Sequence, residues 1–226
     1  MDTKKSHRPQ ATGHRLKNKK ILITAGPTWV PIDSVRVISN IASGETGILL
    51  AEKLNNLGAK VTLLMGPGRV CCLNKKIRLI PFSFFDELRS KLRKELQSRS
   101  YDIIIHSAAV SDFKTQRLIK GKLNSDKTYN LRLLPLPKII QDIRRLARVA
   151  KIVMFKLEQN ISDKALIERA KIAQIKANAH LVVANRLDPY RAFIIDRKGK
   201  TISVKSKNDL AIKLTKILKL ISRLKR

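Results

Sequence analysis

Cysteine is scarce in this sequence, and its placement narrows the class of protein. The only two, Cys71 and Cys72, are adjacent. A disulfide between neighbours strains the geometry of the bond, and no CxxC pair is present, so neither a disulfide framework nor a zinc site is indicated. Disulfides are rare in reducing compartments, so this composition fits a reducing compartment, and we expect a cytoplasmic protein.

Acidic residues are the second shortage. The 226 residues include 17 Asp and Glu against 48 Lys and Arg, which gives a formal net charge of +31. Such a charge attracts anions and accelerates their encounter, but it does not identify the anion. Nucleic acid, the ribosomal surface, an anionic membrane and phosphorylated metabolites all remain open. It also remains open that the lysines and arginines form a solvated surface without an anionic partner.

Long hydrophobic runs are also missing. No apolar run approaches the roughly 20 residues that cross a bilayer, so we expect no membrane association. Residues 1–18 are basic and polar without an apolar segment, so they do not resemble a secretory signal, and we expect a disordered basic tail. With 43% hydrophobic residues, the remainder can form a packed core. Its length fits one domain, residues 19–226.

Short apolar segments alternate with amphipathic ones through this domain. The apolar segments are rich in β-branched residues and lack period-2 alternation, which predicts buried strands at residues 21–25, 60–65, 102–106, 152–155 and 181–184. Helical patterns lie between and after them, at residues 43–57, 84–97, 137–146, 162–176 and 207–220. This order predicts an α/β fold of the Rossmann-like type, a three-layer sandwich with a mostly parallel central sheet.

Ligands of such sheets bind beyond the carboxyl ends of the strands, where the strand order reverses. Four segments follow predicted strands in that position: 26–47, 66–68, 107–130 and 155–160. The first is turn-rich up to residue 42 and contains Gly26, Gly44 and Gly47. Glycines let backbone amides approach a phosphate, and Ser43 and Gly44 would begin a helix whose N-terminus favours anions. The alternative is an ordinary turn-rich connection.

The string ITAGPTWVPIDSVRVISNIASGETG resembles the opening signature of the phosphopantothenoylcysteine synthetase family. Three further stretches agree with that family in order and position: SAAVSDF at 107–113, FKLE at 155–158 and VVAN at 182–185. The resemblance covers about residues 19–220 and implies a Rossmann-like synthetase domain. No flavin-dependent decarboxylase domain precedes the match, so we expect the stand-alone form.

The resemblance implies a ligase of coenzyme A biosynthesis that joins 4'-phosphopantothenate to L-cysteine. In that family the carboxylate attacks the α-phosphate of a nucleoside triphosphate, CTP rather than ATP in most bacterial members, and releases pyrophosphate. The cysteine amine then attacks the acyl-nucleotide, and Mg²⁺ would neutralise the triphosphate. A cytoplasmic homodimer is the assembly that the resemblance implies.

Residue roles follow from the same resemblance. Asn40 matches an asparagine that contacts the acyl-nucleotide and is needed for its conversion, and Lys122 matches a flap lysine that meets the triphosphate, so these two are the catalytic candidates. Arg36 and Ala42 join Asn40 as substrate-binding candidates. The nucleotide-binding candidates, besides Lys122, are Gly26, Ser43, Gly44, Ala108, Ala109, Asp112 and Phe155. The metal ligands remain unknown.

Some positions depart from the family pattern. Residues 122–125 read KLNS where the family has KxKK, so Lys120 or Lys127 would have to supply a further charge. Glu45 stands where the family has a lysine, which inverts a charge near the phosphate end. Lys138 stands where the family has an aspartate.

Two other functions remain open. A non-catalytic, basic nucleotide- or nucleic-acid-binding protein with a Rossmann-like fold would use the positive charge, although Tyr and Trp are scarce and no RNA-binding motif is present. A nicotinamide-dependent reductase would need GxGxxG in the first loop and an acidic residue at the end of the second strand, near Met65. The sequence has neither feature. His106 ends a predicted strand without a spaced Asp or Glu to form a triad, so we expect no catalytic role for it.

Overall fold

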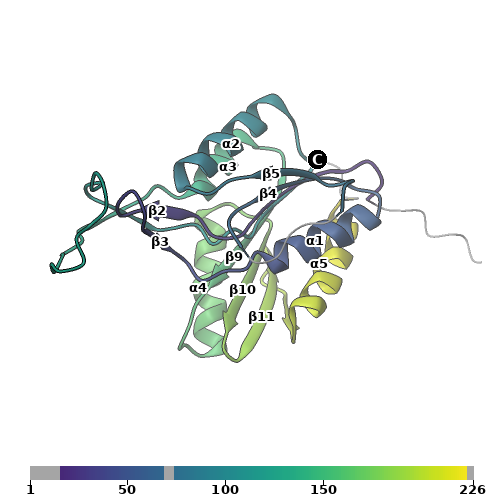
Figure 1. Cartoon of the computed structure of the whole chain (residues 1–226). Helices are drawn as coiled ribbons and strands as arrows, with labels where there is room; N and C mark the ends of the chain where they lie inside the picture. Colours follow the sequence, from purple (N-terminus) through teal and green to yellow (C-terminus); the bar gives the residue numbers. More distant parts are fainter. Residues whose placement is uncertain (1–15, 69–73, 223–226) are drawn as a thin grey trace, which may run out of the picture.

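The computed structural model describes residues 16–68 and 74–222 (Figure 1). Cys71, Cys72 and residues 1–15 of the expected basic tail lie outside the described residues. Within those ranges, eight strands form the central sheet, in the order β12-β11-β10-β9-β6-β1-β4-β5. Their bounds are β1 Lys20–Ala25, β4 Lys60–Met65, β5 Arg78–Pro81, β6 Ile103–His106, β9 Lys151–Leu157, β10 Leu181–Leu187, β11 Tyr190–Asp196 and β12 Thr201–Val204.

The sheet is mostly parallel. The pairs that join β10, β9, β6, β1, β4 and β5 are all parallel, whereas β11 runs antiparallel to both β10 and β12. Consecutive residues of β1, Ile21, Leu22 and Ile23, are fully buried, because helices cover both faces of the sheet. Burial on both faces explains why the strands appear in the sequence as continuous apolar runs.

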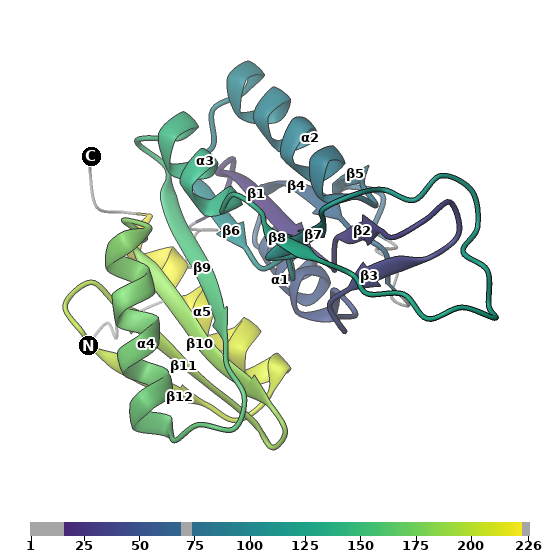
Figure 2. The ribbon, with the colours of Figure 1, turned by 90° about the vertical axis from the view of Figure 1, so that its left-hand side faces the viewer.

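Five helices of the described chain form the outer layers (Figures 1 and 2). Leu54 and Leu214 of α1 and α5 pack with Ile23 on one face, and Leu92 and Leu166 of α2 and α4 belong to the core of the other face. The predicted three-layer Rossmann-like sandwich is therefore confirmed. The helices are α1 Glu45–Asn56, α2 Phe85–Ser98, α3 Ile139–Leu146, α4 Asp163–Lys176 and α5 Lys207–Ile221.

Two small hairpins project from the sandwich and form what we call the arm, residues 29–39 and 113–135. The first hairpin pairs β2 (Trp29–Pro31) with β3 (Val37–Ser39), and the second pairs β7 (Phe113–Thr115) with β8 (Leu133–Pro135). The arm extends to the left in Figure 1 and to the right in Figure 2. The sequence predicted only turns at 26–42, because strands of three residues are too short to show a periodicity.

The start of the domain and the start of α2 differ from the prediction. Leu16, which we expected in the tail, is fully buried in the core, and the Asn18 amide donates to the Gly58 carbonyl at 3.0 Å. The ordered domain therefore begins before residue 19. Helix α2 begins at Phe85, and Glu87 reaches back to accept from the Ser83 amide at 2.7 Å, so a glutamate side chain closes its N-terminus.

No helix in the described part of the chain combines the length and apolar character needed to cross a membrane.

Candidate active site

The strand order reverses between β1 and β6. From β1 the chain continues to β4 and β5 on one side, and then returns to β6, β9 and β10 on the other. The loops that follow β1 and β6 are hydrogen-bonded to each other: the Ala109 amide donates to the Gly26 carbonyl at 2.9 Å, and the Thr28 amide donates to the Ala109 carbonyl at 3.3 Å. These bonds join the two loops at the reversal of strand order, the place where ligands bind in such sheets. We call this place the crevice.

Helix α1 presents its N-terminus at this crevice. Gly44 precedes the helix with φ +77°, a left-handed conformation that favours glycine. At Gly47 a Cβ would lie 2.3 Å from the Cβ of Ala25, so only glycine lets the first turn lie directly against β1. The first amides of a helix lack intrahelical partners, and the helix dipole favours an anion there. The local geometry therefore suits a phosphate.

Asn40 joins the two loops through its side chain. Its amide nitrogen donates to the carbonyls of Ala109 and Val110, at 3.1 Å each, although the residue itself is exposed. The structure therefore brings Asn40, Gly26 and Ala109 together from segments about 70 residues apart in sequence. Ala108, the neighbour of Ala109, also lies in this loop, with its amide 3.4 Å from the Thr24 hydroxyl.

Ser43 and Ala42 complete the approach to α1. Both are partly buried, and the Ser43 hydroxyl lies 3.4 Å from the Glu45 amide, at the long end of a hydrogen bond. Gly68, which follows β4, comes close to Ser43, since a Cβ there would lie 2.6 Å from the Ser43 carbonyl oxygen. The candidates at positions 40–44 thus form one wall of the crevice.

Asp112 lies at the edge of the crevice in an exposed ion pair. Its carboxylate lies 2.5 Å from the ammonium of Lys138, with about 60% of each side chain exposed. Exposed pairs contribute little to stability, about 0–1 kcal/mol. The pair instead places a cation where the family has an aspartate, so the local charge differs from the family pattern.

Arg36 lies in the arm, where a buried carboxylate anchors it. Asp33 accepts the amides of Leu123 at 2.9 Å, Val35 at 2.8 Å and Arg36 at 2.6 Å, and it pairs with the Arg36 guanidinium at 2.5 Å. The Leu123 amide, together with the Val35 and Arg36 contacts, holds the pKa of Asp33 well below its usual range against the opposing effect of burial. Asp33 therefore ties the first hairpin to the connection that contains Lys122.

Lys122 itself is exposed beside this anchor. Hydrogen bonds hold the connection on both sides of it. The Ser34 amide donates to the Gly121 carbonyl, and the Leu123 amide donates to the Asp33 carboxylate. The structure thus brings Lys122 together with Arg36 in the arm, whereas Asn40 contacts the loop after β6.

Sequence reasoning missed one cation of this edge, Lys207. It begins α5, and its ammonium lies 2.5 Å from the carboxylate of Glu45 at the first position of α1. Glu45 was the signal that could have revealed it, because a carboxylate beside an anion site calls for a neutralising partner. Burial, with Asp209 and Glu45 adding negative potential, raises the pKa of Tyr190 in the same neighbourhood to about 12.

Phe155 and His106 complete the crevice strands. Phe155 of β9 is partly buried and packs against the core that α1 and α5 cover, so it has a structural role whatever it contacts in a ligand. His106 ends β6 with its Nδ1 atom 2.8 Å from the Thr24 hydroxyl. Burial lowers the pKa of His106 to about 4, so the ring is neutral at pH 7. Among the described residues, no three His, Cys, Asp or Glu side chains gather as metal ligands.

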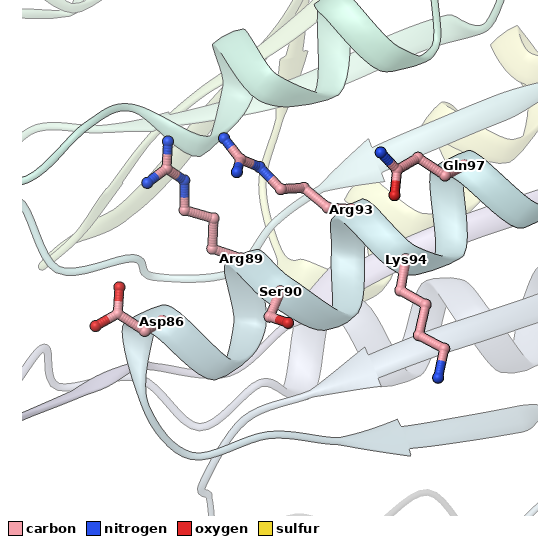
Figure 3. A pocket seen from close by; sticks show the side chains of 6 residues that line it. All are labelled: Asp86, Arg89, Ser90, Arg93, Lys94 and Gln97. Atoms are coloured by element: carbon pink, nitrogen blue, oxygen red, sulfur yellow. The ribbon is translucent and has the colours of Figure 1, made fainter.

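Two hollows lie elsewhere on the molecule. One of about 320 Å³ runs along α2 between residues 86 and 97, where Arg89 and Arg93 point toward α3 and pair with Asp142 (Figure 3). Another of about 170 Å³ lies between the arm and the start of α2. There the rings of Trp29 and Phe84 meet edge-to-face, with their centres 6.0 Å apart. Neither includes Asn40 or the start of α1, so both differ from the crevice.

Comparisons with known proteins identify the family of this chain. The model of the DNA/pantothenate metabolism flavoprotein C-terminal domain matches residues 16–223. The chain is 34% identical over 175 residues to the "Coenzyme A biosynthesis bifunctional protein CoaBC" of Thermococcus kodakarensis, which covers 77% of this chain and 43% of that protein. It is 35% identical over 186 residues to the protein of the same name from Methanocaldococcus jannaschii, which covers 79% and 43%. The chain thus spans about half the length of the curated relatives it matches.

Solved structures show the same fold. The crystal structure of the C-terminal domain of a coenzyme A biosynthesis bifunctional protein CoaBC superposes with a TM-score of 0.77 at 25% identity, over 92% of this chain and 97% of that one. The DNA/pantothenate metabolism flavoprotein from Streptococcus pneumoniae superposes with a TM-score of 0.81 at 24% identity, over 90% and 99%. This chain belongs to the DNA/pantothenate metabolism flavoprotein C-terminal domain family.

Proposed function

We propose that this protein is a phosphopantothenate–cysteine ligase of coenzyme A biosynthesis. One observation carries the proposal: Asn40 bridges the loops after β3 and β6 beside the glycine-flanked start of α1, at the reversal of strand order. The relatives named as coenzyme A biosynthesis proteins support it. A site that holds a phosphate next to a donor amide suits the making and breaking of an acyl phosphate.

The proposed reaction has two steps. The carboxylate oxygen of 4'-phosphopantothenate attacks the α-phosphorus of CTP, and the bond to the β-phosphate oxygen breaks to release pyrophosphate. The amine of L-cysteine then attacks the acyl carbon of the acyl-cytidylate, loses a proton and expels CMP. Both steps develop negative charge on oxygen, so fixed hydrogen-bond donors and cations lower their barriers.

Each candidate residue has a role in this scheme. The amides after Ser43 and Gly44 hold phosphate oxygens at the start of α1, and the Lys122 ammonium meets the triphosphate from the arm. Asn40 positions the acyl-nucleotide by holding the loop of Ala109 in place. Mg²⁺ would enter bound to the triphosphate, as part of the substrate.

The proposal includes a homodimer acting in the cytoplasm. The arm exposes apolar side chains, with Phe113 52%, Leu118 61% and Leu133 43% exposed. Contact with a second copy would remove them from water, and apolar burial contributes about 25 cal/mol per Å². Light scattering on the purified protein measures the mass directly, and a monomer at micromolar concentration would refute this part of the proposal.

Activity is tested by measuring pyrophosphate release. We expect release that requires both CTP and 4'-phosphopantothenate, and product formation only after L-cysteine is added, with ATP replacing CTP poorly. Nucleotide binding without pyrophosphate release would instead favour the non-catalytic alternative, which the KLNS sequence at 122–125 motivates. Equal rates with CTP and ATP would refute the nucleotide preference alone.

A further inference from the structure

The edge of the sheet opposite the crevice carries a line of cations. Three parallel strands begin with lysine: Lys20 in β1, Lys60 in β4 and Lys151 in β9. The turn between β11 and β12 adds Arg197 and Lys200. We call this surface the basic edge and define it by Lys20, Lys60, Arg148, Lys151, Arg197 and Lys200, of which all but the partly buried Lys151 are exposed.

Strand pairing makes these cations neighbours. Lys20 lies opposite Lys60 in the register of β1 and β4, and Lys151 lies opposite Ile103 at the start of β6. Because β11 is antiparallel, its last residue, Asp196, pairs with the first residue of β10, so the following turn lies at the same edge. Neighbouring strands are about 4.8 Å apart, so the basic edge repeats positive charge along a line.

Acidic residues at this edge do not neutralise it. Asp102 accepts from the Lys19 ammonium at 3.2 Å and from the Lys20 amide at 2.9 Å. Its charge therefore pairs with Lys19, which is not one of the six cations that define the basic edge. Asp196 accepts the amides of Lys198 and Lys200 at 2.9 and 3.0 Å within its own turn.

The arginines here contact neutral oxygens. Arg197 donates to the carbonyl and side-chain oxygens of Asn178 and to the Ala179 carbonyl, and Arg144 donates to the same Asn178 carbonyl at 2.9 Å. Burial, together with the charges of Arg197, Arg144 and Lys151, lowers the pKa of His180 to about 4. The local potential is therefore positive.

The start of the described chain also lies at this edge, because the Asn18 amide bonds to the Gly58 carbonyl at 3.0 Å, two residues before Lys60. The ligase reaction proposed above uses none of the six cations of the basic edge.

We propose that the basic edge binds the phosphate backbone of nucleic acid without sequence preference. A line of lysines and arginines matches a linear polyanion, and phosphate contacts alone carry no sequence information. Among the described residues, the exposed aromatic side chains, Phe84, Phe113 and Tyr129, belong to the N-cap of α2 and to the arm, so bases have no stacking platform here. An anionic membrane fits less well, because the cations occupy strand ends and a turn rather than one amphipathic helix.

The test is fluorescence anisotropy with the full-length protein and a labelled oligouridine of about 20 nucleotides, at about 50 and 200 mM salt. The combined variant Lys20→Ala, Lys60→Ala and Lys200→Ala should bind about tenfold more weakly at the lower salt. Its plot of log affinity against log salt should flatten by about 2, since each phosphate contact on a single strand contributes about 0.7.

The matched control is Lys114→Ala, Lys164→Ala and Lys205→Ala, which removes the same charge from exposed positions on the arm and at the crevice edge. It should change affinity less than twofold. Equal losses in both variants would show that net charge alone attracts the oligonucleotide and would overturn the proposal. So would the absence of salt-dependent binding, or binding only to vesicles containing phosphatidylserine.

Pyrophosphate release from both variants separates this proposal from the ligase proposal. We expect full release from the basic-edge variant, because none of its three lysines lies at the crevice. An inactive but nucleic-acid-binding protein would refute the ligase and leave the basic edge standing.

Discussion

Replacing Asn40 with alanine should loosen the contact between the loop after β3 and the loop after β6. The substitution removes two hydrogen bonds, to the Ala109 and Val110 carbonyls at 3.1 Å. A neutral hydrogen bond contributes about 0.5–1.5 kcal/mol, and we take the lower part of that range because Asn40 is exposed. For the two bonds together, we expect about 1–2 kcal/mol less stabilisation of the arrangement that joins the loops. If the transition state bears this whole loss, kcat/KM falls about 5- to 30-fold.

Asn40→Asp should be more damaging than Asn40→Ala. The carboxylate cannot donate, and it would face two carbonyl oxygens that now accept from the Asn40 amide. It would also repel the anionic substrates, so we expect a loss of more than about 100-fold, equivalent to about 2.7 kcal/mol. Pyrophosphate release and product formation, measured separately, show which of the two steps is slowed.

Asn56→Ala is the matched control, because Asn56 is an exposed asparagine at the far end of α1. All three variants should unfold at similar temperatures. If Asn40→Ala keeps kcat/KM within twofold of the unmodified protein, the bridge has no part in catalysis. Equal activity of the aspartate and alanine variants would refute the electrostatic part of the reasoning.

Three further predictions concern stability and the nucleotide. Leu16→Ala should lower the free energy of unfolding by about 2–5 kcal/mol in urea titrations, because Leu16 is fully buried; a loss below about 0.5 kcal/mol would exclude it from the core. Lys207→Ala should raise the KM for the nucleotide several-fold, because the Glu45 carboxylate would stand unpaired at the start of α1. The double variant Glu45→Lys with Lys207→Glu should restore the KM. An unchanged KM in Lys207→Ala would show that this ion pair does not influence nucleotide binding. Because burial lowers the pKa of His106 to about 4 from 6.5, the unfolded chain binds more protons between these values, so stability is fully present above pH 6.5 and falls as the pH drops toward 4. His106→Gln should remove part of that loss, at most about 3 kcal/mol, in urea titrations at about pH 7.5 and 4.5, and the depressed pKa of His180 should account for a remainder; an unchanged pH dependence would refute the assignment.

The sequence predicted the sandwich well because its strands are buried on both faces. Runs such as 21–25 and 102–106 stand out as apolar segments, and the helices between them have long amphipathic patterns. The first hairpin of the arm was missed for the opposite reason, whereas a short strand expected at 131–134 overlaps β8 of the second hairpin. Its strands have three residues each, and what stabilises them is contact with one another and with Asp33, which the local sequence does not reveal.

The roles of the candidate site residues remain predictions. The resemblance to the family selected Gly26, Asn40 and Ala109, and the fold brings these three residues together. Arg36 was expected beside the substrate, yet its contacts are with Asp33 and Leu123 in the arm. Its part in binding substrate remains a prediction for a ligand-bound structure.

The amino-acid sequence by itself determined the α/β class, the order of the helices and buried strands, and the glycine-rich start of α1, because these depend on periodicity and on local backbone conformation. The tertiary structure alone decided which distant groups meet. Glu45 and Lys207 are 162 residues apart, and Lys20 and Lys60 lie side by side only because β1 pairs with β4. Contacts of this kind follow from strand order and register, which depend on the packing of the whole chain and not on any one segment.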